Sequence, residues 1–331
     1  MNWIRFAFIA SLLLLGGAGV ARAQSPLSTS IDVGQREGIG VVPGLQAPRG
    51  DIGVQLSESS VLHVGVTAEA GYDSNVFYQD SSPTASAVAQ IIPQLWITNA
   101  ARVPNGSLPP VTYSLNAALT YREYLTDEST VRAQRAFNPA VAGTLNLFNG
   151  QQFGMTLADS FSRLQDAPYV ASTGNLTHNF NLASVELRLL PGGGRIAGTV
   201  RYTNTWDSFD TQSLKYANNL GHDILGDISW KWLPKTAIYV QGGPTWIHYY
   251  NPGATRHDSF AYRVLGGLRG LITPKINAML GVGYGAATYS GTSADNPSSL
   301  VVTAGLGFQA TEFTKLSLNY QHGFRNSPVL D

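Results

Sequence analysis

The chain contains the stretch Val111-Thr112-Tyr113-Ser114-Leu115-Asn116-Ala117-Ala118-Leu119-Thr120-Tyr121-Arg122, in which apolar and polar side chains alternate. Alternation of this kind places successive side chains on opposite faces of a β-strand. Similar stretches recur from Leu62 onward, and each is long enough for the roughly 9–11 residues that a tilted strand needs to cross a membrane. The pattern predicts an all-β fold, an antiparallel up-and-down transmembrane β-barrel.

Thirteen strands are expected along the chain. They cover about residues 62–72, 86–98, 111–124, 132–148, 152–164, 178–190, 195–206, 220–232, 237–250, 260–272, 276–289, 300–310 and 313–324. Between them, tight turns are expected at 149–150, 191–194, 233–236, 273–275 and 311–312. Longer loops are expected at 73–85, 125–131, 165–177, 207–219, 251–259 and 290–299. The two kinds of connection alternate, with 99–110 as the exception because it is long where a short one is due.

Bacterial barrels have short periplasmic turns and longer extracellular loops. This rule puts the N-terminus in the periplasm and directs the first strand outward. The thirteenth strand would then also run outward, which leaves an unpaired edge, and an unpaired edge is costly in lipid. We therefore expect a C-terminally truncated barrel that has about 14–16 strands when complete. The alternative is a strand missed or merged in the irregular stretch before Pro110.

The composition of the 331 residues argues against several classes of function. Charged residues make up 13% of the chain, about half of the usual share. The net charge is zero, so there is no electrostatic argument for nucleic acid as a partner. The chain has no cysteine, which excludes a disulfide framework, a thiol nucleophile, a zinc–thiolate site and a lipoprotein anchor.

The N-terminus predicts export. Arg5 precedes the apolar run Phe6 to Val20, and Ala21-Arg22-Ala23 fits a small-x-small cleavage site. We expect a signal peptide at 1–23, a weakly structured periplasmic lead-in at 24–60, and the barrel at 61–331. An uncleaved membrane anchor is the alternative, but the apolar run is short for a spanning helix. The expected location is the bacterial outer membrane, reached through the Sec pathway and the periplasm, with lipid and lipopolysaccharide as partners.

Charged residues in the strands are expected to point into the lumen, because charge on the lipid face is costly. The candidates are Glu69, Arg122, Arg132, Glu186, Arg188, Arg201, Asp223, Asp227, Lys231, Arg263 and Arg269. One interpretation is an aqueous channel whose selectivity these charges set. The other is a ladder of ion pairs that fills and stiffens the interior. Inward loops or the lead-in would also plug such a lumen.

Aromatic residues near the strand ends are typical of the two girdles at membrane–water interfaces. The expected girdle residues are Phe148, Phe153, Trp206, Trp230, Trp232, Tyr249, Tyr250, Tyr289, Phe308 and Phe313.

No catalytic activity, metal or cofactor is expected. Rim candidates for an enzyme are His248, His257, Asp258 and Ser259. The last three are consecutive, so an extended backbone turns the middle one away from its neighbours and disfavours a triad. The six histidines show no metal-ligand spacing, and the glycine-rich run Pro191 to Gly194 joins two strands with no helix following.

Several segments resemble outer-membrane β-barrel porins of the family often associated with bacterial exopolysaccharide systems. Tyr72-Asp73-Ser74-Asn75-Val76-Phe77 resembles the Y-D-x-N-V-F signature that ends the first strand of that family. The blocks at 191–195, 232–237 and 266–275 are similar to its turns. The resemblance, over about 62–325, implies porin-like passage of small solutes or a role in exopolysaccharide export, with the export machinery as a partner. The alternative is a structural or adhesive barrel with a plugged lumen. No interface signal is readable, so the oligomeric state stays open.

Overall fold

The computed structural model describes residues 53–57, 59–77, 79, 81–99, 109–165, 177–251, 257–290 and 296–323. The expected signal peptide and most of the expected lead-in lie outside these residues. The described residues form one antiparallel sheet of fourteen strands, together with three short helical turns. None of these helical turns is long and apolar enough to cross a membrane.

The strands have the following bounds. They are β1 (Val54–Gln55), β2 (Val61–Asp73), β3 (Ser86–Thr98), β4 (Val111–Leu125), β5 (Ala136–Leu147), β6 (Phe153–Leu164), β7 (His178–Leu189), β8 (Ile196–Phe209), β9 (Asn219–Leu233), β10 (Thr236–Tyr249), β11 (Ser259–Thr273), β12 (Ile276–Tyr289), β13 (Ser298–Gln309) and β14 (Lys315–His322). The helical turns are α1 (Ser129–Arg132), α2 (Pro191–Gly194) and η1 (Gln212–Ala217).

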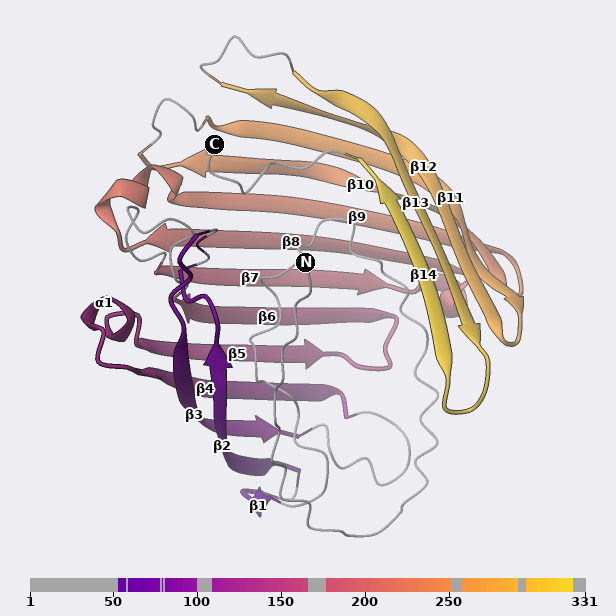
Figure 1. Ribbon diagram of the computed structural model, residues 1–331. Coiled ribbons are helices and arrows are strands. Elements are labelled where there is room, and N and C mark those ends of the chain that lie inside the picture. Colours follow the sequence, from indigo (N-terminus) through magenta and orange to yellow (C-terminus); the bar gives the residue numbers. More distant parts are fainter. Residues whose placement is uncertain are drawn as a thin grey trace.

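The strand order is sequential. Each strand pairs with its neighbours in the chain, from β1 to β14, without a crossover. Figure 1 shows a strongly curved sheet in which β2 and β3 at one end, and β13 and β14 at the other, lie nearer the viewer than the strands between them. The terminal strands β1 and β14 each have one paired neighbour among the described strands. The predicted all-β, up-and-down architecture is therefore confirmed at the level of one antiparallel sheet.

The thirteen expected strands correspond to β2–β14 one by one. Their bounds differ by one or two residues, except at the start of β5 and the end of β8. The expectation for the start of β5 was wrong, because the segment before Ala136 forms the helical turn α1, with a bond from the Arg132 N–H to the Glu128 carbonyl oxygen of 3.0 Å. The strand β1 was not expected. It lies in the lead-in and pairs with Val61 and Leu62 of β2.

Short and long connections alternate from β4 onward, as expected, and the connection from β3 (ending at Thr98) to β4 (beginning at Val111) is the expected long exception. Four of the tight turns join β5–β6, β7–β8, β9–β10 and β11–β12, and the fifth joins β13–β14. We call this side of the sheet the short-turn end and the opposite side the long-loop end. Backbone geometry explains two turns: Phe148 and Gly150 flank the first with φ of 60° and 75°, and Gly192 to Gly194 all have positive φ. Such values reverse the chain sharply and are open to glycine at no steric cost.

The signature segment at the end of β2 packs onto neighbouring strands at the long-loop end. Val76 and Phe77 are buried with Tyr124 of β4 and Val131 of α1. The Asp73 carboxylate accepts a hydrogen bond of 3.0 Å from the Asn75 N–H, which starts the turn. This motif therefore has a structural role, because it anchors the first long loop on the sheet.

Candidate functional site

The two faces of the sheet differ in chemistry. In β2–β14, the exposed large apolar side chains lie on one face, apart from Leu233 at the end of β9. We call this the apolar face; Val64, Ile91, Val200 and Val264 are examples. The opposite face, here the polar face, bears most of the charged side chains in the strands.

Ten of the eleven charged candidates lie on the polar face. The cross-strand pairs Glu186–Arg201, Thr199–Asp227 and Thr203–Asp223 place residues from three strands there in one register. The exception is Arg132, whose expected strand position is wrong. It belongs to α1, and its guanidinium donates a bond of 3.2 Å to the Asp127 carbonyl oxygen.

Two ion pairs connect strands on the polar face. The Arg201 guanidinium lies 2.5 Å from the Glu186 carboxylate on the adjacent strand. The Arg269 guanidinium reaches Asp227 across β10, with two bonds of 2.6 and 3.0 Å. Arg269 also lies over the Tyr239 ring, at 4.8 Å from its centroid. This second pair combines a bidentate contact with a cation–π contact, so it holds three strands together.

Other polar-face charges are held by neutral partners. The Thr245 hydroxyl donates a bond of 2.6 Å to the Asp223 carboxylate, and the Gln90 amide donates to Glu69. The Arg122 guanidinium donates 2.8 Å to the Gln165 carbonyl oxygen. These contacts fix the positions of the two acids on the polar face.

An apolar cluster also lies on the polar face, and the sequence analysis did not identify it. Tyr239, Leu265, Met279 and Val301 are buried together across β10–β13. Gly281 makes room for them, since a methyl group there would collide with the Tyr239 hydroxyl. The Tyr239 and Thr303 hydroxyls have no hydrogen-bond partner among the described residues. This part of the polar face is therefore packed rather than lined by charge.

The expected aromatic girdle residues divide between positions. Phe153, Trp206, Trp230, Trp232 and Phe308 lie on the apolar face. Phe148, Tyr250 and Phe313 lie in connections just beyond the strands. Tyr249 and Tyr289 contradict the expectation, because the strand register places them on the polar face.

The sequence analysis missed Trp246, Phe260 and Tyr262, which lie on the apolar face near the long-loop end. The Trp246 and Phe260 rings are 5.5 Å apart. They stand at the same alternate positions as the other apolar-face residues of β10 and β11, and this alternation could have identified them.

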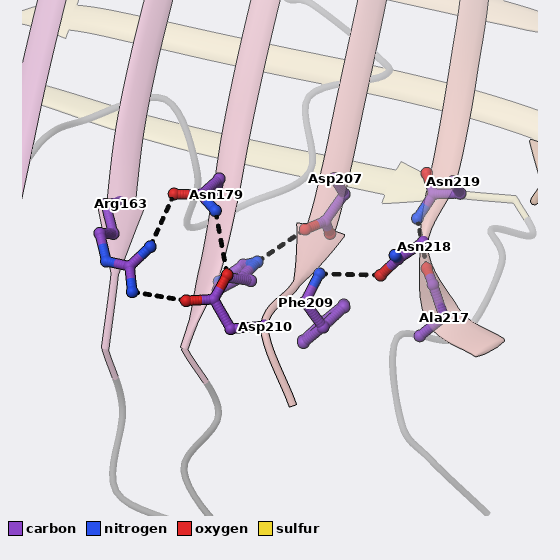
Figure 2. A network of polar contacts seen from close by, with 9 residues as sticks. Arg163, Asn179, Asp207, Phe209, Asp210, Ala217, Asn218 and Asn219 are labelled. Atoms are coloured by element: carbon purple, nitrogen blue, oxygen red, sulfur yellow. Dashed lines mark hydrogen bonds and ion pairs between the residues drawn. The ribbon is translucent and has the colours of Figure 1, made fainter. Parts of the chain in front are cut away.

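A hydrogen-bond network fastens the long-loop end of β6–β9 (Figure 2). Arg163 contacts the Asp210 carboxylate at 2.5 Å and the Asn179 side-chain oxygen at 3.2 Å. In the same network, the Phe209 N–H donates 2.8 Å to the Asn218 side-chain oxygen. The loop around η1 is thus tied to strand ends on both sides.

The network also includes a pair with little solvent exposure, 13% for the His178 side chain and 9% for that of Asp207. His178 Nδ1 lies 2.7 Å from an Asp207 oxygen, and the His178 ring stacks on Phe209 at 4.9 Å. Both residues of the pair lie on the polar face.

Two of the four rim candidates for catalysis come together. His248 Nδ1 donates a bond of 2.7 Å to Asp258, and the Tyr249 N–H donates 2.8 Å to the same carboxylate. Ser259 pairs with Ile247 on the polar face, whereas His248 lies on the apolar face, so the serine and the histidine point apart. Among the described residues, no group of three or more histidine or acidic side chains is placed to hold a metal ion.

The contacts of Asp258 give a pH dependence. Burial acts to raise the pKa of this carboxyl, but the Tyr249 N–H and His248 outweigh it and leave the pKa below its ordinary value of 3.8. A lowered folded-state pKa stabilises the fold above the unfolded pKa, and this contribution is lost as the pH falls through the folded pKa.

Replacing Asp258 by Asn is therefore expected to lower the stability at pH 7 by about 0.5 kcal/mol, the small effect usual for solvent-exposed contacts of a charged group. The difference from wild type should shrink below pH 3.8, where wild type loses the same contribution. Urea unfolding of both proteins at pH 7 and pH 3 measures this. A difference that stays constant with pH would contradict the assigned role of the carboxylate.

The chain matches no model of a known protein family, and no curated protein sequence is significantly similar to it.

Proposed function

We propose that the sheet closes into an outer-membrane β-barrel that passes small solutes or assists exopolysaccharide export. The observation that supports this most is the segregation of the two faces. Large apolar side chains stay exposed on one face of β2–β14, and most of the charged side chains in the strands lie on the other. A soluble protein would bury the apolar face, whereas lipid covers it at no cost.

The connections support the same proposal. Apart from the β3–β4 connection, the turns at one end are short and the loops at the other are long, which is the arrangement of bacterial outer-membrane barrels. The expected export signal and the resemblance to exopolysaccharide-associated porins agree with it. The export role rests on that resemblance, since no contact in the sheet identifies a sugar.

A second candidate is a structural or adhesive barrel with a plugged lumen. The apolar cluster of Tyr239, Leu265, Met279 and Val301 favours it, because this cluster fills part of the face that would line the channel. An open lumen would instead be lined mainly by the charged side chains.

Single-channel conductance in a planar bilayer tests both candidates. The protein is extracted from outer membranes, and heat-modifiable gel mobility first verifies a folded barrel. Steady conductance supports the channel. A folded barrel that is electrically silent supports the plugged alternative, and the absence of heat modification rejects the barrel itself.

If the barrel conducts, replacing Arg188 and Arg263 together by Glu is expected to shift its selectivity toward cations. Both side chains lie on the polar face, where reversing them changes the fixed charge by four units. Reversal potentials in a salt gradient measure the shift. Lys235→Glu and Lys275→Glu, in the short turns, form the matched control and should change selectivity less. Equal shifts in both pairs would contradict a lumen lined by the polar face.

A further inference from the structure

Polar side chains interrupt the apolar face, and four of them lie close together on β6–β9. Asp159 of β6 aligns with Ala183 of β7, then with Asn204 of β8 and His222 of β9, across one row of the sheet. Asn181 lies on the same face, two residues from Ala183 along β7. Lipid-facing positions in a barrel are otherwise apolar, so this row requires a separate explanation.

The four side chains bond to one another in two groups. The Asn181 amide donates 2.9 Å to one oxygen of Asp159. In the second group, the Tyr202 hydroxyl lies 2.7 Å from His222 Nδ1, and the Asn204 amide lies 3.4 Å from the same nitrogen. The first group contains the Asp159 carboxylate. The second contains the His222 imidazole, with the Tyr202 hydroxyl and the Asn204 amide next to its Nδ1.

A shallow hollow of about 540 Å³ adjoins this row on the apolar face. Its lining includes Leu145, Leu157, Val185 and Tyr202, together with the small residues Gly143 and Ala183. The small residues leave space in this lining, and the exposed Tyr202 ring belongs both to the lining and to the second group of the polar row.

We propose that this surface, the β4–β9 patch, binds a second copy of the chain. The proposal rests on the proposed membrane location. There, a carboxylate such as Asp159 that faces hydrocarbon is unfavourable, and a protein neighbour would replace the lipid. The patch is therefore an interaction surface whose polar row is covered in the assembled state.

Self-complementarity identifies the partner as another copy. In a symmetric dimer the same patch meets itself, so it must hold both halves of each contact. Asp159 supplies an acceptor, the His222 ring nitrogen that is not bonded to Tyr202 supplies a donor, and Tyr202 is a large ring beside a hollow. Phosphate-rich lipid headgroups would be repelled by the Asp159 charge, so they complement the patch less well than a second copy does.

Cysteine cross-linking tests the contact. The chain has no cysteine, so a single introduced thiol reports one position. Ala183→Cys places the thiol in the hollow, and Leu268→Cys places a matched thiol on the apolar face of β11. Treating outer membranes with a short bis-maleimide should give a covalent dimer with Ala183→Cys and none with Leu268→Cys. Dimers in neither variant, or equally in both, would overturn the proposal.

A second measurement tests the role of the polar row in the dimer separately from the folding of the barrel. Replacing Asp159 and His222 together by Leu should make the detergent-solubilised protein monomeric by light scattering, with heat-modifiable mobility retained. Wild type should contain more than one copy. A heat-modifiable but monomeric wild type rejects the dimer and leaves the barrel standing, whereas loss of heat modification in wild type rejects the proposed function instead.

Discussion

Val264→Arg is expected to destabilise the protein in a bilayer by about 2–4 kcal/mol, the cost of an arginine on the lipid face of a barrel near the midplane. Val264 lies in the middle of β11 on the apolar face, and 54% of its side chain is exposed. In a soluble protein the same exposed position would tolerate a charge within about 0.5 kcal/mol. Urea unfolding from lipid vesicles, followed by gel mobility, measures the difference.

The adjacent residue provides the control for Val264. Arg263 lies on the polar face, and Arg263→Val changes the side chain in the opposite sense one residue away. We expect it to change stability less and to leave insertion intact. If Val264→Arg inserts and unfolds like wild type, the apolar face is not in contact with lipid.

Asp227→Ala is expected to destabilise the sheet by about 3 kcal/mol, because it leaves the Arg269 guanidinium partly buried without its acid. The Arg269 and Asp227 side chains are 20% and 13% exposed, and their contact is bidentate. Equilibrium unfolding in vesicles measures the loss. An Asp227→Ala protein as stable as wild type would show that solvent already screens this pair.

Two further variants identify the cause of that loss. The double variant Asp227→Ala with Arg269→Met removes the stranded charge and should recover most of the stability. Glu186→Ala should cost less than Asp227→Ala, because Glu186 and Arg201 are more exposed, at 27% and 29%. If the double variant is as unstable as the single one, lost packing rather than unpaired charge is responsible.

The sequence predicted the strands well because one physical rule governs them all. A strand with one apolar and one polar face must alternate, and the turns at 149–150 and 191–194 mark its ends with residues suited to positive φ. The same rule placed Glu186, Arg201 and Asp227 on one face. It failed at α1, where four residues form a helical turn too short for any periodic signal.

Details of the faces were less predictable, because they depend on register and packing. Tyr249 was assigned to a girdle by its position near a strand end, yet the pairing of β10 with β9 places it on the polar face. The cluster around Tyr239 breaks the alternation, since its members are apolar residues on the polar face. Asp159 and His222 break it in the opposite sense. Such departures from a pattern become visible only when neighbouring strands are aligned.

The uninterrupted strand order would allow the proposed barrel to change its width one hairpin at a time. Because every strand from β1 to β14 pairs only with its chain neighbours, the β-hairpin is the repeating unit of the architecture. Duplicating or deleting one hairpin would change the circumference while preserving the remaining pairings, and barrel diameter grows roughly linearly with strand number. If the sheet closes as proposed, the width of its lumen would therefore change in steps of two strands, without any redesign of distant contacts.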